Sequence, residues 1–284
     1  MSLVDIAGNL TNKAFREDLP AVLERAAGAG VSLIVVAGVS TTTSHRGWWM
    51  ASDHRSARNA KLTPLELVAT SGIHPHHASQ ASSQALVEVA DLAHKDLVVA
   101  IGECGLDYNR DFSPRDAQRR AFEAQLEIAS GTSKPVYLHE RDAHEDFTKI
   151  LERWRPKLAG GLVHCFTGDR KTLERYLAMD LHIGFTGWLC DERRGQHLRE
   201  LVRLVPRGRI MVETDCPYIL PRDMSPKPKS GRNEPAFVAH VARAVAEARG
   251  ESFEDLAAHT TATARSFFGL PLRPGLDGCG RSSA

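Results

Sequence analysis

The chain alternates short apolar runs, rich in β-branched residues, with longer segments whose apolar residues recur three and four positions apart. The first pattern is typical of buried strands and the second of amphipathic helices. Because a helical segment follows nearly every apolar run, the pattern predicts a parallel sheet, and eight strands are the number that closes a barrel. The sequence therefore indicates an α/β fold, a TIM (β/α)8-like barrel. The predicted strands are Leu3–Gly8, Val31–Val39, Leu67–Ile73, Val98–Glu103, Pro135–His139, Gly161–His164, His182–Phe185 and Arg209–Glu213.

The domain organisation follows from where this alternation stops. Helical spacing continues through residues 235–250 and 252–269, and no repeat or linker-like composition interrupts the chain before that point. Residues 270–284 are rich in Pro, Gly and Ser and have no periodicity. We therefore predict a single domain over residues 1–269 and a disordered tail over 270–284.

Composition narrows the classes of function. The 284 residues are 42% hydrophobic and 25% charged, which is ordinary for a soluble globular protein, and the formal net charge is only +1. A nucleic-acid binder with a broad basic surface is thereby excluded, so any phosphate contacts must be local. The chain has no apolar run of membrane-spanning length and no secretory signal pattern, and its five cysteines show no C-x-x-C spacing. We expect a cytoplasmic monomer with reduced thiols and no membrane association.

Polar residues stand where five of the eight predicted strands end: His74, Glu103, His139, His164 and Asp215. In a barrel of parallel strands these ends converge on one face, where active sites are built. Taken singly, each residue is more often a strand cap or a satisfied core side chain, but five together outweigh that interpretation. Imidazole and carboxylate are ligands of divalent cations, and a cation supplies the opposite charge that a buried carboxylate needs. The pattern predicts a metal site in which Glu103 is able to bridge two ions.

A cysteine directly follows three of these residues, at Cys104, Cys165 and Cys216. Successive side chains of a strand face opposite ways, so we predict that these thiols pack against the helices. A thiol nucleophile is the alternative, and it requires a paired base and a lowered pKa.

Several longer motifs resemble one family. "GIHPH", "GECGLDYNR", "HCFTG", "GFTGWLCDERRG", "ETDCPYILPRD" and "KPKSGRNEP" occur in this order, and over residues 4–269 the chain resembles the TatD family of metal-dependent deoxyribonucleases. The resemblance implies a barrel hydrolase of the metal-dependent, amidohydrolase-like superfamily. It further implies a 3′-5′ exonuclease acting on single-stranded DNA, and also on RNA, with a role in DNA repair. The metal residues that it implies are Glu103, His139, His164 and Asp215, with His74 beside them.

Two departures from the family pattern affect the expected site. Many members carry an H-x-H pair after the first strand, where residues 9–11 of this chain read Asn-Leu-Thr. Without that pair of imidazoles we expect an oxygen-rich site around Glu103 and Asp215, which suits Mg²⁺ better than Zn²⁺. We therefore expect one or two divalent ions, Mg²⁺ first, with Mn²⁺ and Zn²⁺ as alternatives. Glu140 stands where relatives carry cysteine, and strand alternation predicts that it faces away from the metals.

Roles for these residues follow from the needs of phosphodiester hydrolysis. Glu103 is expected to hold the cation, Asp215 to ligate it and accept a proton from the attacking water, and His74 to hold the phosphate or protonate the leaving oxygen. Loops after the seventh and eighth strands are basic, although such clusters are often only solvated surface. The aromatic residues Tyr108, Phe166 and Trp188 adjoin the motifs as candidates for stacking on bases, although aromatic residues at such positions more often belong to the core. The expected substrate-binding residues are His74, His76, Arg193, Arg194, Arg222 and Arg232.

Two other functions remain open at this stage. One is a metal amidohydrolase that cuts C–N or ester bonds, including a D-aminoacyl-tRNA deacylase. Several such enzymes bridge two metals with a carboxylated lysine at a strand end, but Lys134 precedes its strand and is expected at the opposite end of the barrel. The other is a barrel that only binds nucleic acid or a partner protein. The missing lysine favours the nuclease without excluding either alternative.

Overall fold

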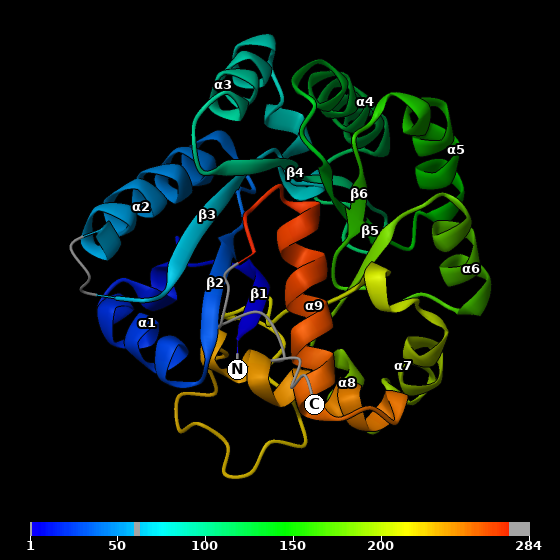
Figure 1. Cartoon of the computed structure of the whole chain (residues 1–284). Coiled ribbons are helices and arrows are strands. Elements are labelled where there is room, and N and C mark those ends of the chain that lie inside the picture. The colour runs from blue at the N-terminus through cyan, green and yellow to red at the C-terminus, as the bar shows by residue number, and fades with distance from the viewer. Residues whose placement is uncertain (1, 60–62, 273–284) are drawn as a thin grey trace, which may run out of the picture.

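Eight parallel strands and nine α-helices make up the part of the chain that the computed structural model describes, residues 2–59 and 63–272 (Figure 1). The strands are β1 (Leu3–Gly8), β2 (Val31–Val36), β3 (Glu66–Ser71), β4 (Val98–Asp107), β5 (Val136–Arg141), β6 (Gly161–Val163), β7 (His182–Phe185) and β8 (Ile210–Val212). The helices are α1 (Leu19–Gly28), α2 (Thr41–Asn59), α3 (Ser83–Ala93), α4 (Arg115–Thr132), α5 (His144–Trp154), α6 (Arg170–Ala178), α7 (Gln196–Leu201), α8 (Val238–Arg249) and α9 (Phe253–Phe267).

The strands form one sheet in the order β1 to β8, and every neighbouring pair is parallel. The sheet closes between β1 and β8, where Gly8 bridges to Cys216 and the carboxylate of Asp5 accepts hydrogen bonds from Thr214 N at 2.9 Å and Thr214 Oγ1 at 2.6 Å. The Asp5 side chain thus joins β1 to the segment after β8. We call this junction the seam of the barrel, and regular strand pairing across it is short. The predicted barrel is confirmed.

The second strand ends earlier than its apolar run. β2 stops at Val36 instead of the predicted Val39, because the backbone of Gly38 turns to other partners. Gly38 N donates to Thr70 Oγ1 at 2.9 Å, and Gly38 O accepts from Glu103 N at 2.8 Å. Gly38, near the end of this apolar run, therefore holds the backbone of Glu103, the last residue of the predicted fourth strand.

β4 is four residues longer than predicted and continues to Asp107. Its extension pairs with β5, with Gly105 opposite His139 and Asp107 opposite Arg141. A Cβ atom on Gly105 would lie 1.9 Å from His139 O, and its φ is +144°, so only glycine allows this approach. Gly105, two residues after Glu103, therefore allows β4 to lie close to β5 beyond the predicted strand end.

The core has two layers, one inside the barrel and one between barrel and helices. Cys104 and Cys216 are buried in the outer layer, and the Glu140 carboxylate faces outward to the hydroxyl of Tyr176 at 2.8 Å, as predicted. The prediction for Cys165 is wrong. This residue lies beyond the last residue of β6 with φ +49°, so strand alternation no longer applies, and its sulfur lies 3.8 Å from Thr186 Oγ1.

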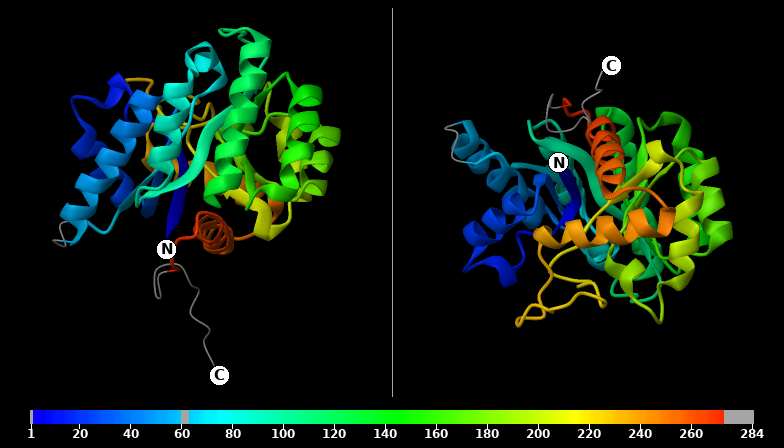
Figure 2. Two further views of the ribbon diagram at one scale, coloured as in Figure 1. Left: turned by 90° about the horizontal axis from the view of Figure 1, so that it is seen from above. Right: turned by 60° about the horizontal axis from the view of Figure 1, so that its bottom comes forward.

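Helix α9 covers the amino-terminal end of the barrel (Figure 2). Its Thr261 Oγ1 donates to Ser2 O at 2.8 Å, and Ala264 and Phe268 pack against the barrel interior. Lys134 Nζ donates to Val98 O at the same end, where the sequence places it. The carboxyl ends of the strands are therefore left for a functional site.

Two further features concern the ends and helices of the chain. Residues 270–272 have no regular secondary structure, and the rest of the predicted tail lies outside the described residues, so the domain boundary stays a prediction. Among the helices of the described residues, none has both the length and the apolar character that crossing a bilayer requires.

Candidate metal centre

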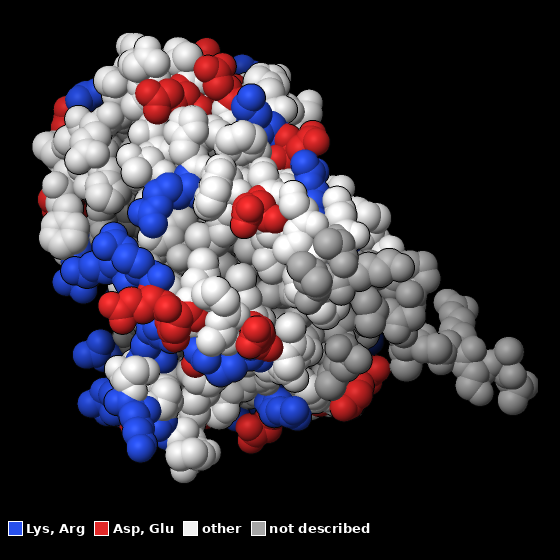
Figure 3. All heavy atoms as spheres, turned by 90° about the vertical axis from the view of Figure 1, so that its left-hand side faces the viewer, with Lys and Arg blue, Asp and Glu red and all other residues white. Residues whose placement is uncertain are grey.

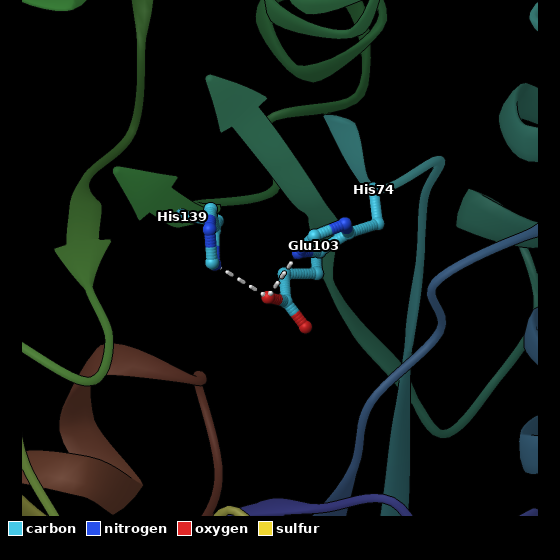
Figure 4. A group of neighbouring side chains, drawn as sticks. All are labelled: His74, Glu103 and His139. Atoms are coloured by element: carbon cyan, nitrogen blue, oxygen red, sulfur yellow. Dashed lines mark hydrogen bonds and ion pairs between the residues drawn. The ribbon is translucent and has the colours of Figure 1, made fainter. Parts of the chain in front are cut away.

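One carboxylate oxygen forms the centre of the site. Oε1 of Glu103 lies 2.8 Å from His164 Nε2, 3.1 Å from His139 Nδ1 and 3.2 Å from His74 Nε2. The imidazoles come from the segments after β3 and β6 and from β5, and Figure 4 shows His74 and His139 directed at Glu103 from two sides. The structure thus brings together four of the five residues that the sequence places at strand ends.

His74 has a defined hydrogen-bonding direction. It begins a short 3₁₀ helix, Pro75–Gln80, and its Nδ1 accepts a hydrogen bond from His76 N at 3.0 Å. Neutral His74 therefore carries its proton on Nε2 and donates it to Glu103. Burial lowers the pKa of His74 to about 4, so the ring stays neutral at physiological pH.

The charges in the cluster balance one another. Burial opposes ionisation of Glu103, but the charge of His164 and the hydrogen bonds from His139 and His164 outweigh it and hold the pKa of the Glu103 carboxyl well below its usual range. Burial likewise opposes charging of His164, yet the negative charge of Glu103 raises the pKa of His164 well above its usual value. Protons therefore lie between buried imidazole nitrogens and carboxylate oxygens, atoms that could also serve as metal ligands. This donor set fits a divalent cation, which would replace those protons.

Asp215 lies in the same region of charge, just after β8. Its Oδ1 accepts a hydrogen bond from Asn9 Nδ2 at 2.9 Å. Burial raises the pKa of Asp215 to about 7, and the charge of His164 opposes this while that of Glu103 adds to it. Asn9 therefore supplies an amide hydrogen-bond donor to Asp215 at the position where many family members have the first imidazole of their pair.

Two carboxylates that received no role from the sequence support the imidazoles. Asp107 Oδ2 accepts from His76 Nε2 at 2.8 Å and from His139 Nε2 at 3.2 Å. Glu213, fully buried, places Oε2 at 3.4 Å from His164 Nδ1. Carboxylates on the outer nitrogen of a ligating histidine fix its tautomer and orientation. Both carboxylates could have been recognised in the sequence by their spacing, because residues an even number of positions apart on a strand share a face. Asp107 is four residues after Glu103, and Glu213 is two residues before Asp215.

The predicted substrate-binding arginines differ in their surroundings. Arg193 and Arg222 share one acidic neighbour: their Nε atoms lie 3.7 Å and 3.6 Å from the two carboxylate oxygens of Asp191, and both side chains are exposed. Arg194 is exposed beside them. On the side of the molecule in Figure 3, Lys and Arg side chains gather along one edge with Asp and Glu among them. The positive charge of Arg193 and Arg222 is therefore partly neutralised by Asp191.

Arg232 is bound within the protein. Its Nη1 and Nη2 donate to the carboxylate of Asp18 at 2.8 Å and 2.7 Å, and its guanidinium lies 4.8 Å from the ring centre of Phe15. These contacts fasten the segment after β8 to the segment before α1. The structure gives Arg232 an anchoring role and does not bring its charge to Glu103.

The aromatic residues near the site differ in how well they could stack on a base. Phe166 is buried and packs edge-on against Tyr176 and Phe185, so it belongs to the core and is not a stacking surface for bases. Two exposed rings to which the sequence gave no role adjoin residues of the site. Phe112 is 68% exposed with its ring centre 4.8 Å from that of His76, and Tyr218 is 54% exposed three residues after Asp215.

Comparison with known proteins places the chain in a family. A family model described as TatD related DNase matches residues 4–269. A protein of Erwinia amylovora named 3′-5′ ssDNA/RNA exonuclease TatD is 47% identical over 268 residues, covering 94% of this chain and 100% of that protein. One of the same name from Shigella flexneri is 44% identical over 94% of this chain and 99% of its own. A solved TatD homologue from Escherichia coli has a TM-score of 0.84 at 26% identity, over 95% of this chain and 98% of that one. This chain belongs to the TatD family of DNases.

Proposed function

We propose that this protein is a divalent-cation-dependent nuclease that hydrolyses phosphodiester bonds, as a 3′-5′ exonuclease on single-stranded DNA and RNA. The observation that carries the proposal is the convergence of three imidazoles on one oxygen of Glu103, beside Asp215, at the open end of the barrel. Relatives that bear the exonuclease name are 44% to 48% identical over nearly the whole chain, which supports the same activity here.

The residues that would hold the cation are Glu103, His139, His164 and Asp215. Ligand atoms of His74, Glu103 and His139 also lie within 4.8 Å of one another. We assign His74 to the substrate instead, because its Nδ1 accepts from a backbone N–H and its Nε2 carries a proton. Mg²⁺ is the proposed ion, with Mn²⁺ and Zn²⁺ as alternatives and one or two ions bound. When bound, the cation neutralises phosphate charge and makes water a better nucleophile.

The chain's own groups complete the chemistry. Asn9 holds one oxygen of Asp215, which leaves the other oxygen to accept a proton from the attacking water. His74 Nε2–H is a donor for a phosphate oxygen or for the departing oxygen. Asp107 keeps His139 and His76 in place on either side of this donor.

Contacts to the nucleic acid would come from the rim. We propose Arg193, Arg194 and Arg222 as phosphate contacts, since all three are exposed on the loops after β7 and β8. Phe112 beside His76, and Tyr218, are the proposed stacking surfaces for bases, because both rings are exposed close to the centre. Arg232 would act through the loop that it anchors to Asp18.

End-labelled single-stranded oligonucleotides test the proposal. We expect no cleavage in EDTA and, on restoring Mg²⁺, a ladder of products shortened from the 3′ end. Mn²⁺ and Zn²⁺ in parallel reactions identify the preferred ion. Metal-stimulated release of amino acid from D-aminoacyl-tRNA without any oligonucleotide shortening would contradict the nuclease, as would binding without cleavage. The role in DNA repair, the monomeric state and the cytoplasmic location stay predictions.

A further inference from the structure

We propose that Cys190, Asp223 and His240 form a second cation site, suited to Zn²⁺, that fastens the loops after β7 and β8 to helix α8. This site is separate from the Glu103 centre, and the proposal does not depend on the nuclease activity.

The three side chains converge from different parts of the chain. Cys190 ends the short 3₁₀ helix Gly187–Cys190 after β7, Asp223 lies in the segment after β8, and His240 is in the first turn of α8. Their ligand atoms all lie within 4.8 Å of one another, with His240 Nε2 at 2.7 Å from Asp223 Oδ1. Tetrahedral zinc, with Zn–S of about 2.3 Å and Zn–N of about 2.1 Å, places neighbouring ligand atoms about 3.6 Å apart. Side-chain adjustments of about 1 Å would therefore complete the site.

The donor set has the chemistry of a zinc site. A thiolate, a carboxylate and a neutral imidazole together carry two negative charges, which one divalent ion balances. The thiolate makes the set softer than the oxygen-rich Glu103 centre, and therefore better suited to Zn²⁺ than to Mg²⁺. Without a cation, burial and the neighbouring Asp223 raise the pKa of the Cys190 thiol to about 12. A thiol held protonated in this way is a poor nucleophile, which argues against a catalytic cysteine here.

Burial and surrounding charge also favour a cation. Cys190 is 4% exposed, whereas the side chains of Asp223 and His240 are 44% and 32% exposed, so the outer coordination position would remain open to water. Nearby Arg199 is paired with Glu247 at 3.1 Å, so its charge is already offset. No ion pair within the described residues sets a cation directly against Asp223 apart from His240 itself.

The site would order the basic rim. Asp191, next to Cys190, lies 3.6 Å from Arg222, which is next to Asp223, so the two loops already meet beside the cluster. A zinc ion bound to both loops and to α8 would hold the arginines of this rim in fixed positions.

Cobalt substitution tests thiolate ligation. Metal-stripped full-length protein titrated with Co²⁺ is expected to develop a near-ultraviolet sulfur-to-cobalt charge-transfer band, which the Glu103 centre cannot give through its nitrogen and oxygen ligands. Cys190→Ser should abolish the band. Cys165→Ser is the matched control, since Cys165 is the thiol near Asp215, and it should retain the band. Absence of the band in the wild type, or its survival in Cys190→Ser, would overturn the proposal.

A second variant leaves the thiol in place. His240→Ala should weaken Zn²⁺ binding to the cluster by at least about tenfold, because even partners outside the ligand shell change metal affinity that much. Zn²⁺ should also slow tryptic cleavage after Lys229 in the wild type and leave the rate unchanged in His240→Ala. Equal protection of the two proteins would contradict the site. Neither readout uses nuclease activity, so failure of the proposed function would leave this test intact.

Discussion

Asp107 accepts a hydrogen bond from Nε2 of His139 at 3.2 Å, while Nδ1 of the same ring faces Glu103. The carboxylate thereby fixes which nitrogen keeps the proton and which is free to face a cation. It also binds His76 at 2.8 Å, so one side chain orients two histidines of the site.

Asp107→Asn is expected to weaken cation binding by about 10- to 100-fold through loss of this orientation. The Mg²⁺ concentration for half-maximal cleavage should rise, and saturating Mg²⁺ should recover most of the activity. Asp111→Asn is the control, since Asp111 is exposed and, within the described residues, forms an ion pair with Arg115 alone. An unchanged Mg²⁺ dependence in Asp107→Asn would contradict the role.

Asp215→Asn removes the proposed proton acceptor while keeping a similar shape. We expect the turnover number to fall by about 10² to 10⁴, the range for loss of a general base. Oligonucleotide binding should change little, because Asp215 is not among the proposed phosphate contacts. Single-turnover cleavage and fluorescence anisotropy separate the two quantities. Cleavage at the wild-type rate would exclude Asp215 from the chemistry.

The rim arginines and Arg232 should respond differently to substitution. Replacing Arg193 and Arg194 with Ala should weaken oligonucleotide binding and flatten its dependence on log salt by about 0.7 for each phosphate that an arginine no longer neutralises. Arg232→Ala should instead lower the urea midpoint, because it leaves Asp18 without its bidentate partner. Its salt slope should match the wild type. A flattened slope in Arg232→Ala would show that this residue contacts phosphate after all.

Gly105 should tolerate no side chain. Gly105→Ala would place Cβ 1.9 Å from His139 O at φ +144°, so we expect a loss of several kcal/mol in the free energy of unfolding, measured with urea. Gly131→Ala is the matched control in α4, where an added Cβ meets nothing within 4 Å. That variant should be as stable as the wild type or more stable by up to about 1 kcal/mol. Equal effects at the two positions would argue against the close approach.

The seam residue Asp5 predicts a pH dependence of stability. Burial raises the pKa of Asp5 to about 7, although hydrogen bonds from Thr214 and Ala7 oppose the rise. An unfolded chain has an Asp pKa of about 3.9, so between roughly pH 4 and pH 7 the folded protein binds a proton that the unfolded chain does not. Its contribution to stability is therefore greatest below pH 4 and is lost as the pH rises to 7.

Asp5→Asn should remove that part of the slope. Urea unfolding of the metal-free protein at several pH values between 4 and 7 measures it, at about 1.4 kcal/mol per unit of pKa difference. Parallel slopes for the two proteins would mean that Asp5 ionises normally in the folded state.

The amino-acid sequence by itself determined the barrel and the positions of its main polar groups. Apolar periodicity and strand polarity are local properties, so the eight strands were recognisable, and with them the histidines and acids at their ends. β2 ends three residues before its predicted end and β4 ends four residues after its predicted end. The reason is that the backbones of Gly38 and Gly105 contact partners on other strands. The even spacing of Asp107 from Glu103 was visible, but its bond to His139 was not.

Only the tertiary structure decided which distant side chains meet. Arg232 binds Asp18 across 214 positions, and Cys190, Asp223 and His240 converge from two loops and a helix. Cys165 departs from alternation because its strand has already ended. These outcomes depend on how loops and helices pack on the barrel, and the hydrophobic pattern of a segment carries information about its own burial but not about its partner.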